Sequence, residues 1–199
     1  CEVDMVVFCE LRYNFSTVDA SKNLASWFHD EHPTRSVSAH NIHDKLKSVH
    51  QQGGTSMACF NECLHHAKKP TKDIRGLGRW CSWPFCAHPD HRFRVVVAYN
   101  LCKSKPKGLR TMHQQQLRYT QENNLDHSPA ELFRSDFIQQ CKQWTKEGDR
   151  LCIFMDANED ILKGKLNPWY PDHACVSIKD RDLVGAIDFA ATQLILHYE

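Results

Sequence analysis

The chain has 199 residues, with 25 lysines and arginines against 24 aspartates and glutamates, and a net charge of +1 at pH 7. It is 41% hydrophobic and 25% charged, which is typical of a globular domain and excludes a disordered tail, a collagen-like fibre and a coiled-coil rod. No apolar run approaches the roughly 20 residues of a membrane helix, so we expect no membrane partner. The balanced charge argues against a protein that binds nucleic acid by bulk charge, so any phosphate chemistry must come from a local site.

The first half of the chain contains two predicted strands. Residues 3–9 form a nearly continuous apolar run that ends at Glu10, which is typical of a strand. Residues 20–28 have a helical pattern, and residues 35–50 show no clear period. Gly53-Gly54 predicts a turn before a strand over residues 55–60, and residues 61–69 predict a short helix that Pro70 ends.

The second half contains a predicted strand pair and three predicted helices. Residues 79–86 and 93–99 fit two strands joined by a turn over residues 88–91. A polar helix is expected over residues 111–123, and another begins at Ser128, which forms a capping-box pattern with Glu131. Gly148 is placed to end that helix. A strand over residues 151–155 follows, and a last helix is expected over residues 182–197.

These elements do not alternate as they do in a doubly wound parallel fold. The strand pairs favour mixed or antiparallel sheets with helices outside them, so we expect an α+β fold. No internal repeat or linker is visible, and the chain is interpreted as a single domain over residues 1–199.

Ten cysteines are many for a chain of this length. Four of them lie in apolar or amphipathic stretches, where a thiol is usually a small buried hydrophobe: Cys9, Cys59, Cys141 and Cys152. We therefore expect mostly reduced thiols, which favours an intracellular location, cytoplasmic or nuclear. No signal peptide is visible, and the chain begins with cysteine rather than methionine, so we expect residues to precede it in the gene product.

Two carboxylates and one amide stand at strand ends. Glu10 and Asp156 each end an apolar run, where a carboxylate leaves the core and is still held by it. Asn158 lies two residues beyond Asp156, so both side chains can face one pocket. The carboxylate could orient a water molecule and the amide could bind a phosphate oxygen. The alternative is an ordinary Asx turn after a strand.

An ordered set of motifs accompanies these residues. It comprises Gly53-Gly54-Thr55, Gly76–Trp83, Arg94–Tyr99, Gln114–Tyr119, Ala130–Phe133 and Gly148–Glu159. Together they resemble the endonuclease/exonuclease/phosphatase superfamily, the deoxyribonuclease-like fold, and most closely its divergent members in retroelement-associated and orphan reading frames of eukaryotic microbes. The resemblance covers most of residues 3–160.

The resemblance implies a four-layer α/β/β/α sandwich of two mixed sheets and a metal-dependent hydrolysis of phosphodiesters with Mg²⁺ or Mn²⁺. Glu10 matches the family's metal-binding glutamate, and Asp156 matches the aspartate that positions the attacking water. Asn158 and Tyr99 match residues that contact the phosphate. DNA is the implied substrate, and a retroelement with its reverse transcriptase is the implied context.

The sequence departs from the family pattern in four places. Met155 stands where the motif has glycine, and Asn100-Leu101-Cys102 follows Tyr99 where many members have a proline-containing turn. The family's first strand would precede Cys1, and the closing Asp-His pair would follow later strands; Asp172-His173 comes too early for that pair. The resemblance therefore implies a partial domain that lacks the first strand and the C-terminal strands, and implies activity for the family rather than for this chain.

Other side chains could bind substrate. Arg79 and Trp80 could contact phosphate and stack on bases, and Trp83 shares this possibility; the alternative is packing within a sheet, where neighbouring residues face opposite sides. A basic loop that contains Lys103, Lys105 and Lys107 follows the motif tyrosine, and it is interpreted as a solvated loop more readily than as a phosphate clamp.

Two clusters of cysteine and histidine invite comparison with zinc sites. Neither has the tight Cys-x2-Cys spacing of a strong site, and we expect no structural zinc. The clusters are Cys81, Cys86, His88 and His91, and Cys59, Cys63, His65 and His66.

The sequence thus predicts a metal-dependent, endonuclease-like hydrolase acting on nucleic acid. Two alternatives stay open at this point: a catalytically dead remnant that binds nucleic acid or protein, and a phosphatase acting on a small phosphorylated molecule or a lipid. Nothing in the sequence indicates an oligomeric state.

Overall fold

The computed structural model describes residues 3–11, 34–47, 53–88, 91–105, 108–158, 165, 174–178 and 194–198. Within these residues the fold is mixed α+β with two β-sheets, as the sequence predicts. The predicted helix over residues 20–28 lies outside the described residues, and so does Asp172-His173. None of the described helices is long and apolar enough to span a membrane.

The smaller sheet has three strands in the order β1-β3-β2. The strands are β1 (Met5–Cys9), β2 (Thr34–Ala39) and β3 (Thr55–Phe60). The two strands predicted in this part of the chain are confirmed, and β2 arises where the sequence showed no clear period. Both described pairings are antiparallel, which is one of the two arrangements that the strand pattern favoured. The short helix η1 (Asp44–Leu46) follows β2.

The larger sheet has six strands in the order β4-β5-β6-β7-β9-β8. They are β4 (Thr71–Lys72), β5 (Trp80–His88), β6 (His91–Tyr99), β7 (Asp149–Asp156), β8 (Ala174–Ile178) and β9 (Leu194–Tyr198). The predicted pair β5–β6 is confirmed as antiparallel, and β6, β7, β9 and β8 run parallel. The helix predicted over residues 182–197 is wrong at its end, which belongs to β9, because a short apolar run fits a buried parallel strand as well as a helix.

Two helices connect β6 to β7, namely α3 (Met112–Glu122) and α4 (Pro129–Lys146), and the short helix α2 (Cys63–His66) follows β3. The predicted capping box at the start of α4 is confirmed. The Ser128 hydroxyl accepts a hydrogen bond from the Glu131 amide at 3.3 Å, and the Glu131 carboxylate accepts one from the Ser128 amide at 2.9 Å. Gly148 follows this helix with φ +92°, a conformation that costs glycine little.

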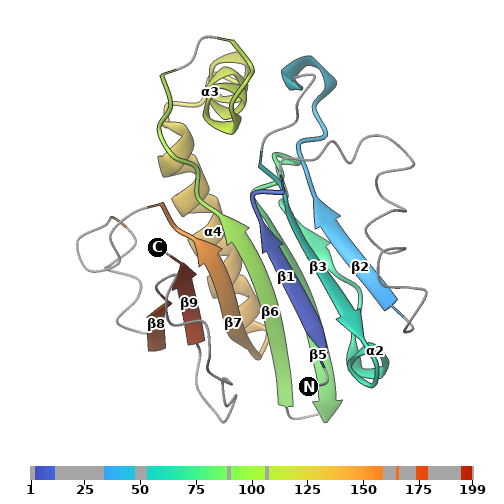
Figure 1. Ribbon diagram of the computed structural model, residues 1–199. Coiled ribbons are helices and arrows are strands. Elements are labelled where there is room, and N and C mark those ends of the chain that lie inside the picture. Colours follow the sequence, from blue (N-terminus) through green and yellow to red (C-terminus); the bar gives the residue numbers. More distant parts are fainter. Residues whose placement is uncertain are drawn as a thin grey trace.

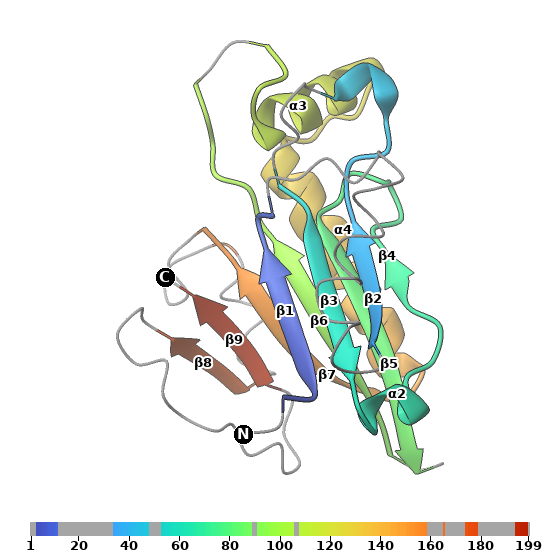
Figure 2. The same ribbon diagram turned by 45° about the vertical axis from the view of Figure 1, so that its right-hand side comes forward.

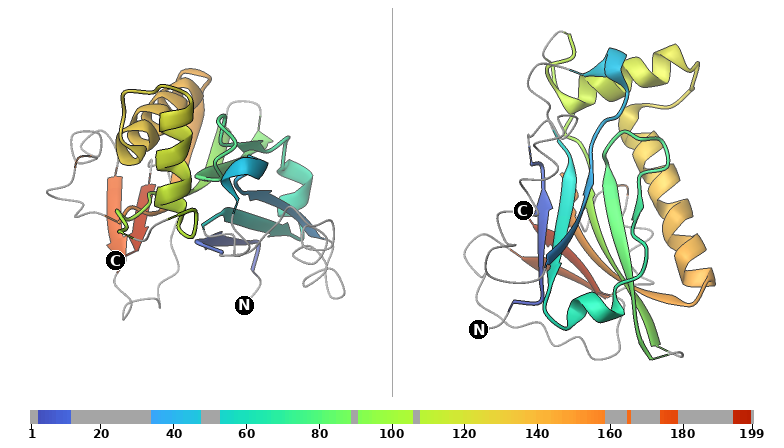
Figure 3. Two further views of the ribbon diagram at one scale, coloured as in Figure 1. Left: turned by 90° about the horizontal axis from the view of Figure 1, so that it is seen from above. Right: turned by 90° about the vertical axis from the view of Figure 1, so that its right-hand side faces the viewer.

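Two hydrophobic clusters divide the molecule into layers, which Figure 3 shows edge-on. One cluster lies between the sheets and includes Val37, Ala39, Met57 and Cys59 from the small sheet and Cys81, Trp83, Phe85, Val95 and Val97 from the large one. The other lies between the large sheet and α4, and includes Trp80, Val96, Ala98, Phe133, Phe137, Cys141, Trp144, Leu151, Ile153 and Met155. The large sheet is therefore buried on both faces in its central strands.

The strands β1, β6 and β7 run in the same direction, and all three end on the side of the molecule where α3 lies (Figures 1 and 2). In the register between β6 and β7, Tyr99 is opposite Asp156. This shared strand end brings the acidic residues that follow β1 and close β7 to one edge of the sandwich.

Candidate functional site

Alternation along the strands decides which way the residues at this strand end face. Val95 and Val97 belong to the cluster between the two sheets, so Tyr99, two residues further along β6, lies on that same face. On β7, Phe154 packs against the same cluster, and Asp156 therefore lies on the face that looks toward β1 as well.

The end of β1 is fixed against these two strands through Cys9. Its thiol donates to the carbonyl oxygen of Ala98 at 3.5 Å. Glu10 comes next, in the left-handed region at φ +52°, and its carboxylate lies near enough to Tyr99 for its charge to add to burial in raising the pKa of that tyrosine. The structure thus brings together Glu10, Tyr99 and Asp156, three of the residues predicted from sequence.

The two carboxylates give this corner a negative field. Burial raises the pKa of Tyr99, and the charges of Glu10 and Asp156 raise it further. Burial also raises the pKa of the Cys9 thiol to about 12, with a contribution from the same two charges. The pKa of Cys102 is raised by burial, by Asp156 and by Glu10. The charges of Glu10 and Asp156 therefore add to the effect of burial on three neighbouring side chains, and raise the pKa values of Tyr99, Cys9 and Cys102.

Asn158 joins this corner from the loop after β7, at φ +48°. Its backbone amide donates to Asp156 Oδ1 at 3.2 Å, which is the Asx turn that the sequence allowed. Its side-chain Nδ2 donates to the carbonyl oxygen of Asn100 at 2.7 Å, and its Oδ1 accepts from the Cys102 thiol at 2.6 Å. The amide therefore ties the ends of β6 and β7 together.

Sequence reasoning missed the contributions of Asn100 and Cys102. Asn100 is 3% exposed, and its Nδ2 donates to the carbonyl oxygen of Ala157 at 2.7 Å. Its Oδ1 is buried with no hydrogen-bond partner in the structure. The sequence signal that could have identified Asn100 is its position directly after Tyr99, because β6 ends there beside β7, which ends at Asp156.

The donor chemistry of this corner fits Mg²⁺ or Mn²⁺. Such a hard cation binds oxygen ligands, commonly one or two carboxylates completed by water and substrate phosphate. Glu10 and Asp156 would supply the carboxylates. Within the described residues no three histidine, cysteine, aspartate or glutamate side chains gather as a metal cluster, so the fit rests on the carboxylate pair.

The structure contradicts the predicted substrate contacts of Arg79 and Trp80, because both side chains are fully buried. Trp80 packs between the large sheet and α4, with the Arg79 guanidinium over its ring at 4.5 Å. Trp83 is also buried, on the opposite face, and donates to the carbonyl oxygen of Lys68 at 2.7 Å. The packing alternative is correct for both tryptophans.

Arg79 belongs to a buried ionic cluster that the sequence did not predict; we define it as Arg75, Arg79, Asp73 and Asp136. The Arg79 Nη2 atom lies 2.7 Å from Asp73 Oδ1 and 2.9 Å from Asp136 Oδ2. Arg75 Nη2 donates to Asp136 Oδ1 at 3.0 Å. The cluster joins the loop before β5 to α4, which gives Arg79 a structural role.

The structure places the cysteines of the two cysteine and histidine clusters as follows. Cys81 is fully buried between the sheets and accepts a hydrogen bond from the Thr55 hydroxyl at 3.7 Å, while Cys86, an odd number of residues further along β5, lies on the other face. Cys59 and Cys63 are in side-chain contact, and that contact lowers the pKa of Cys63 while it raises that of Cys59. The described cysteines are free thiols.

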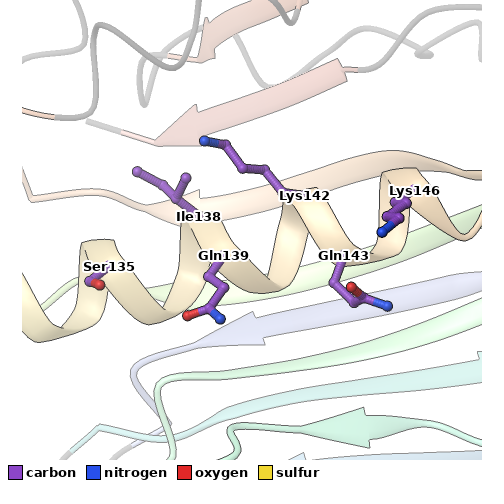
Figure 4. Close-up of a pocket in the computed structure, with 6 residues that line it drawn as sticks. All are labelled: Ser135, Ile138, Gln139, Lys142, Gln143 and Lys146. Atoms are coloured by element: carbon purple, nitrogen blue, oxygen red, sulfur yellow. The ribbon is translucent and has the colours of Figure 1, made fainter.

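Two hollows lie away from this corner. A cavity of about 750 Å³ lies where β1, β6 and β7 begin, with Met5, Val7, Val95 and Phe154 among its lining. A hollow of about 490 Å³ lies along α4, and Figure 4 shows its six lining residues, all from that one helix. Neither hollow includes Glu10 or Asp156.

No protein-family model matches the chain, and no curated protein matches it either.

Proposed function

We propose that this chain is a metal-dependent phosphodiester hydrolase acting on nucleic acid, with its site at the shared end of β1, β6 and β7. The observation that carries the proposal is the convergence of Glu10 and Asp156 beside Tyr99: Asp156 is opposite Tyr99 in the strand register, and the charges of both carboxylates add to burial in raising the pKa of Tyr99. A convergence of residues 146 positions apart is not required by an Asx turn, which involves Asp156 and Asn158 alone.

Glu10 and Asp156 would hold the divalent cation, Mg²⁺ or Mn²⁺, which supplies positive charge to the phosphate oxygens during hydrolysis. Tyr99 lies beside these carboxylates, and burial together with their charges raises its pKa, so it stays a neutral hydroxyl that can donate a hydrogen bond. Asp156, a carboxylate at the edge of the corner, accepts a hydrogen bond from the attacking water and orients it.

Asn158 has a role compatible with its observed bonds. An amide nitrogen carries two N–H groups, so the bond from Nδ2 to the Asn100 carbonyl oxygen leaves a second N–H that can donate to a phosphate oxygen. The Cys102 thiol, bonded to Asn158 Oδ1, holds the amide in the orientation that this donation needs.

The finer architecture that accompanies this function is a four-layer sandwich. Three of its layers correspond to α4, the large sheet and the small sheet. A fourth layer is supported by the outer face of β3: Ser56, Ala58 and Phe60 alternate with the residues that face the large sheet, and they are only 0%, 0% and 6% exposed. The burial of these three side chains supports a further layer against the outer face of β3.

The direct test is hydrolysis of bis(p-nitrophenyl) phosphate and of plasmid DNA with Mg²⁺ or Mn²⁺, comparing the chain with Asp156→Ala. Loss of a positioned acid–base group costs about 10²- to 10⁴-fold in rate, so we expect the variant to lose at least about 100-fold. A calorimetric titration of Mn²⁺ should lose its binding event in Glu10→Gln.

The matched control is Asp44→Asn. The Asp44 side chain is 92% exposed on η1, and its removal should leave both rates and Mn²⁺ binding unchanged. Hydrolysis that is absent, or that survives in Asp156→Ala, would overturn the proposed site and favour a binding module without activity.

A further inference from the structure

The site is bordered on one side by exposed positive charge. We define the basic ridge as Lys103, Lys105 and Arg110, which are all exposed and lie between β6 and α3. The ridge starts next to Cys102, whose thiol contacts Asn158 at 2.6 Å. Positive side chains therefore begin one residue away from the corner that contains Asp156.

The segment that carries the ridge is bonded to α3 at both ends. The Ser104 and Thr111 hydroxyls are hydrogen-bonded to each other at 2.7 Å, and Gln114 Nε2 donates to the carbonyl oxygen of Ser104 at 3.2 Å. Gln115 Nε2 donates to the carbonyl oxygen of Leu109 at 3.0 Å. These bonds distinguish the ridge from the freely solvated loop that the sequence favoured.

The fixed ends also hold the ridge next to the site. Gln115 is fully buried and its Oε1 accepts from Asn41 at 3.0 Å. At the start of α3, Met112 packs with Tyr99. Burial lowers the pKa of His113 in the first turn of α3, and the charge of Lys103 lowers it further. Lys103 of the ridge and Tyr99 of the acidic corner are thus both neighbours of the first turn of α3.

We propose that the basic ridge binds the phosphate groups that flank the scissile phosphate, so that the site selects a nucleic acid strand over an isolated phosphodiester; this inference rests on the proposed function. A duplex strand carries one phosphate per 3.4 Å of axis, and a strand cleaved at the acidic corner therefore carries further phosphates beside it. A small phosphodiester or a phosphorylated lipid lacks that row of phosphates.

The charges in this region are arranged to suit such a strand. Glu10 and Asp156 repel phosphate unless a cation is present, whereas Lys103, Lys105 and Arg110 attract it. A polymer can bridge both parts, because one phosphate lies at the corner while its neighbours contact the ridge. An isolated diester occupies the corner alone and gains nothing from the ridge.

The experiment compares Lys103→Gln/Lys105→Gln with Lys142→Gln/Lys146→Gln in the whole chain. The second pair removes two exposed positive charges from the hollow along α4, so the two variants have the same net charge. Binding of a fluorescent single-stranded 12-mer DNA is measured by anisotropy at several salt concentrations, with a chelator to prevent cleavage. Hydrolysis of bis(p-nitrophenyl) phosphate is measured separately with Mn²⁺.

We expect the ridge variant to bind the oligonucleotide about tenfold more weakly and its salt dependence to decrease by about 1.4 in the slope of log affinity against log salt, since each contact to single-stranded phosphate contributes about 0.7. The α4 variant should retain the affinity and slope of the unmodified chain. Hydrolysis of the small diester should change by less than about twofold in the ridge variant.

The proposed role of the basic ridge would be overturned if the two variants lost the same affinity for the oligonucleotide. It would also be overturned if the unmodified chain did not bind the oligonucleotide. So would a loss of small-diester hydrolysis in the ridge variant as large as its loss of affinity for the oligonucleotide. Failure of the proposed function has a different signature: no Asp156-dependent hydrolysis of the small diester, while the anisotropy comparison between the two variants still decides the role of the ridge.

Discussion

Two groups of carboxylates near the strand ends behave in opposite ways. In the buried ionic cluster, Asp73 and Asp136 lie against Arg75 and Arg79. Burial by itself raises the pKa of Asp136, but the hydrogen bonds and charges of the two arginines outweigh it, so the pKa lies below its usual value. At the acidic corner, burial raises the pKa values of Tyr99, Cys9 and Cys102, and the charges of Glu10 and Asp156 raise them further.

The difference shows how one fold uses the same side-chain chemistry for two purposes. Carboxylates surrounded by guanidinium groups are neutralised inside the protein and hold the β5 loop to α4. At the acidic corner, two carboxylates from strands far apart in the sequence meet at one edge of the sandwich, and such oxygen atoms are the ligands that a hard divalent cation prefers. The first arrangement stabilises the fold, and the second suits the cation of the proposed function.

Arg79→Ala should have the largest effect on the free energy of unfolding. It tests the structural role of the buried ionic cluster. The substitution leaves Asp73 and Asp136 buried without the guanidinium that contacts both, and loss of one partner from a buried ion pair costs about 3–5 kcal/mol. Urea unfolding followed by tryptophan fluorescence measures this loss.

The matched substitution on the other side is Glu10→Gln. Because it removes one of two like charges and keeps the side-chain size, the free energy of unfolding should stay within about 1 kcal/mol of that of the unmodified chain. A destabilisation of Glu10→Gln as large as that of Arg79→Ala would contradict the division into a structural and a binding group.

The pH dependence of stability sharpens the comparison further. The folded-state pKa of Asp136 is lowered, so its contribution is present above the usual carboxyl range and is lost as the pH falls below about 4. The folded-state pKa of Cys9 is raised from 9.0 to about 12, so its contribution is present below pH 9 and is lost between pH 9 and about 12.

Chemical denaturation over this pH range tests both signs. Cys9→Ser removes the thiol that must stay protonated in the folded state, and the alkaline decline should become shallower by about 1.4 kcal/mol per pH unit. The acid decline should stay unchanged in this variant. A decline between pH 9 and 12 that is the same with and without Cys9 would contradict the assigned pKa.

Much of the strand framework follows from local patterns in the sequence. The apolar runs over residues 55–60 and 151–155, and the capping box at Ser128, are local signals that packing reinforces. The end of the chain was misjudged because the apolar run in β9 fits a helix and a buried parallel strand equally well. Only pairing with β7 and β8, which lie far away in the sequence, decides between them.

The site was predictable in part for the same reason. Glu10 and Asp156 could be named because each ends an apolar strand, and strand ends are positions that local sequence reveals. Arg79 was misassigned because its neighbours in the sequence, Trp80 among them, resemble a stacking surface. One of its two carboxylate partners, Asp136, lies on α4, 57 residues away in the sequence. A local sequence pattern does not predict such a contact.

The smallest predicted effect concerns the reactivity of Cys102. Its thiol is exposed, and its pKa is raised by burial, by Asp156 and by Glu10. Asp156→Asn removes one of those charges, so the thiolate fraction at pH 8 rises and alkylation by iodoacetamide should become about two- to fivefold faster. Millimolar Mn²⁺ should accelerate alkylation of the unmodified chain in the same way, because a cation held by the carboxylates cancels the same field.

Cys102→Ser identifies the modified peptide, and Glu122→Gln, which removes a charge from the end of α3, should leave the rate of alkylation unchanged. If Asp156→Asn accelerates alkylation and Mn²⁺ does not, the negative field is real but the corner does not hold a metal, and the carboxylates then serve the fold in the way that Asp136 does.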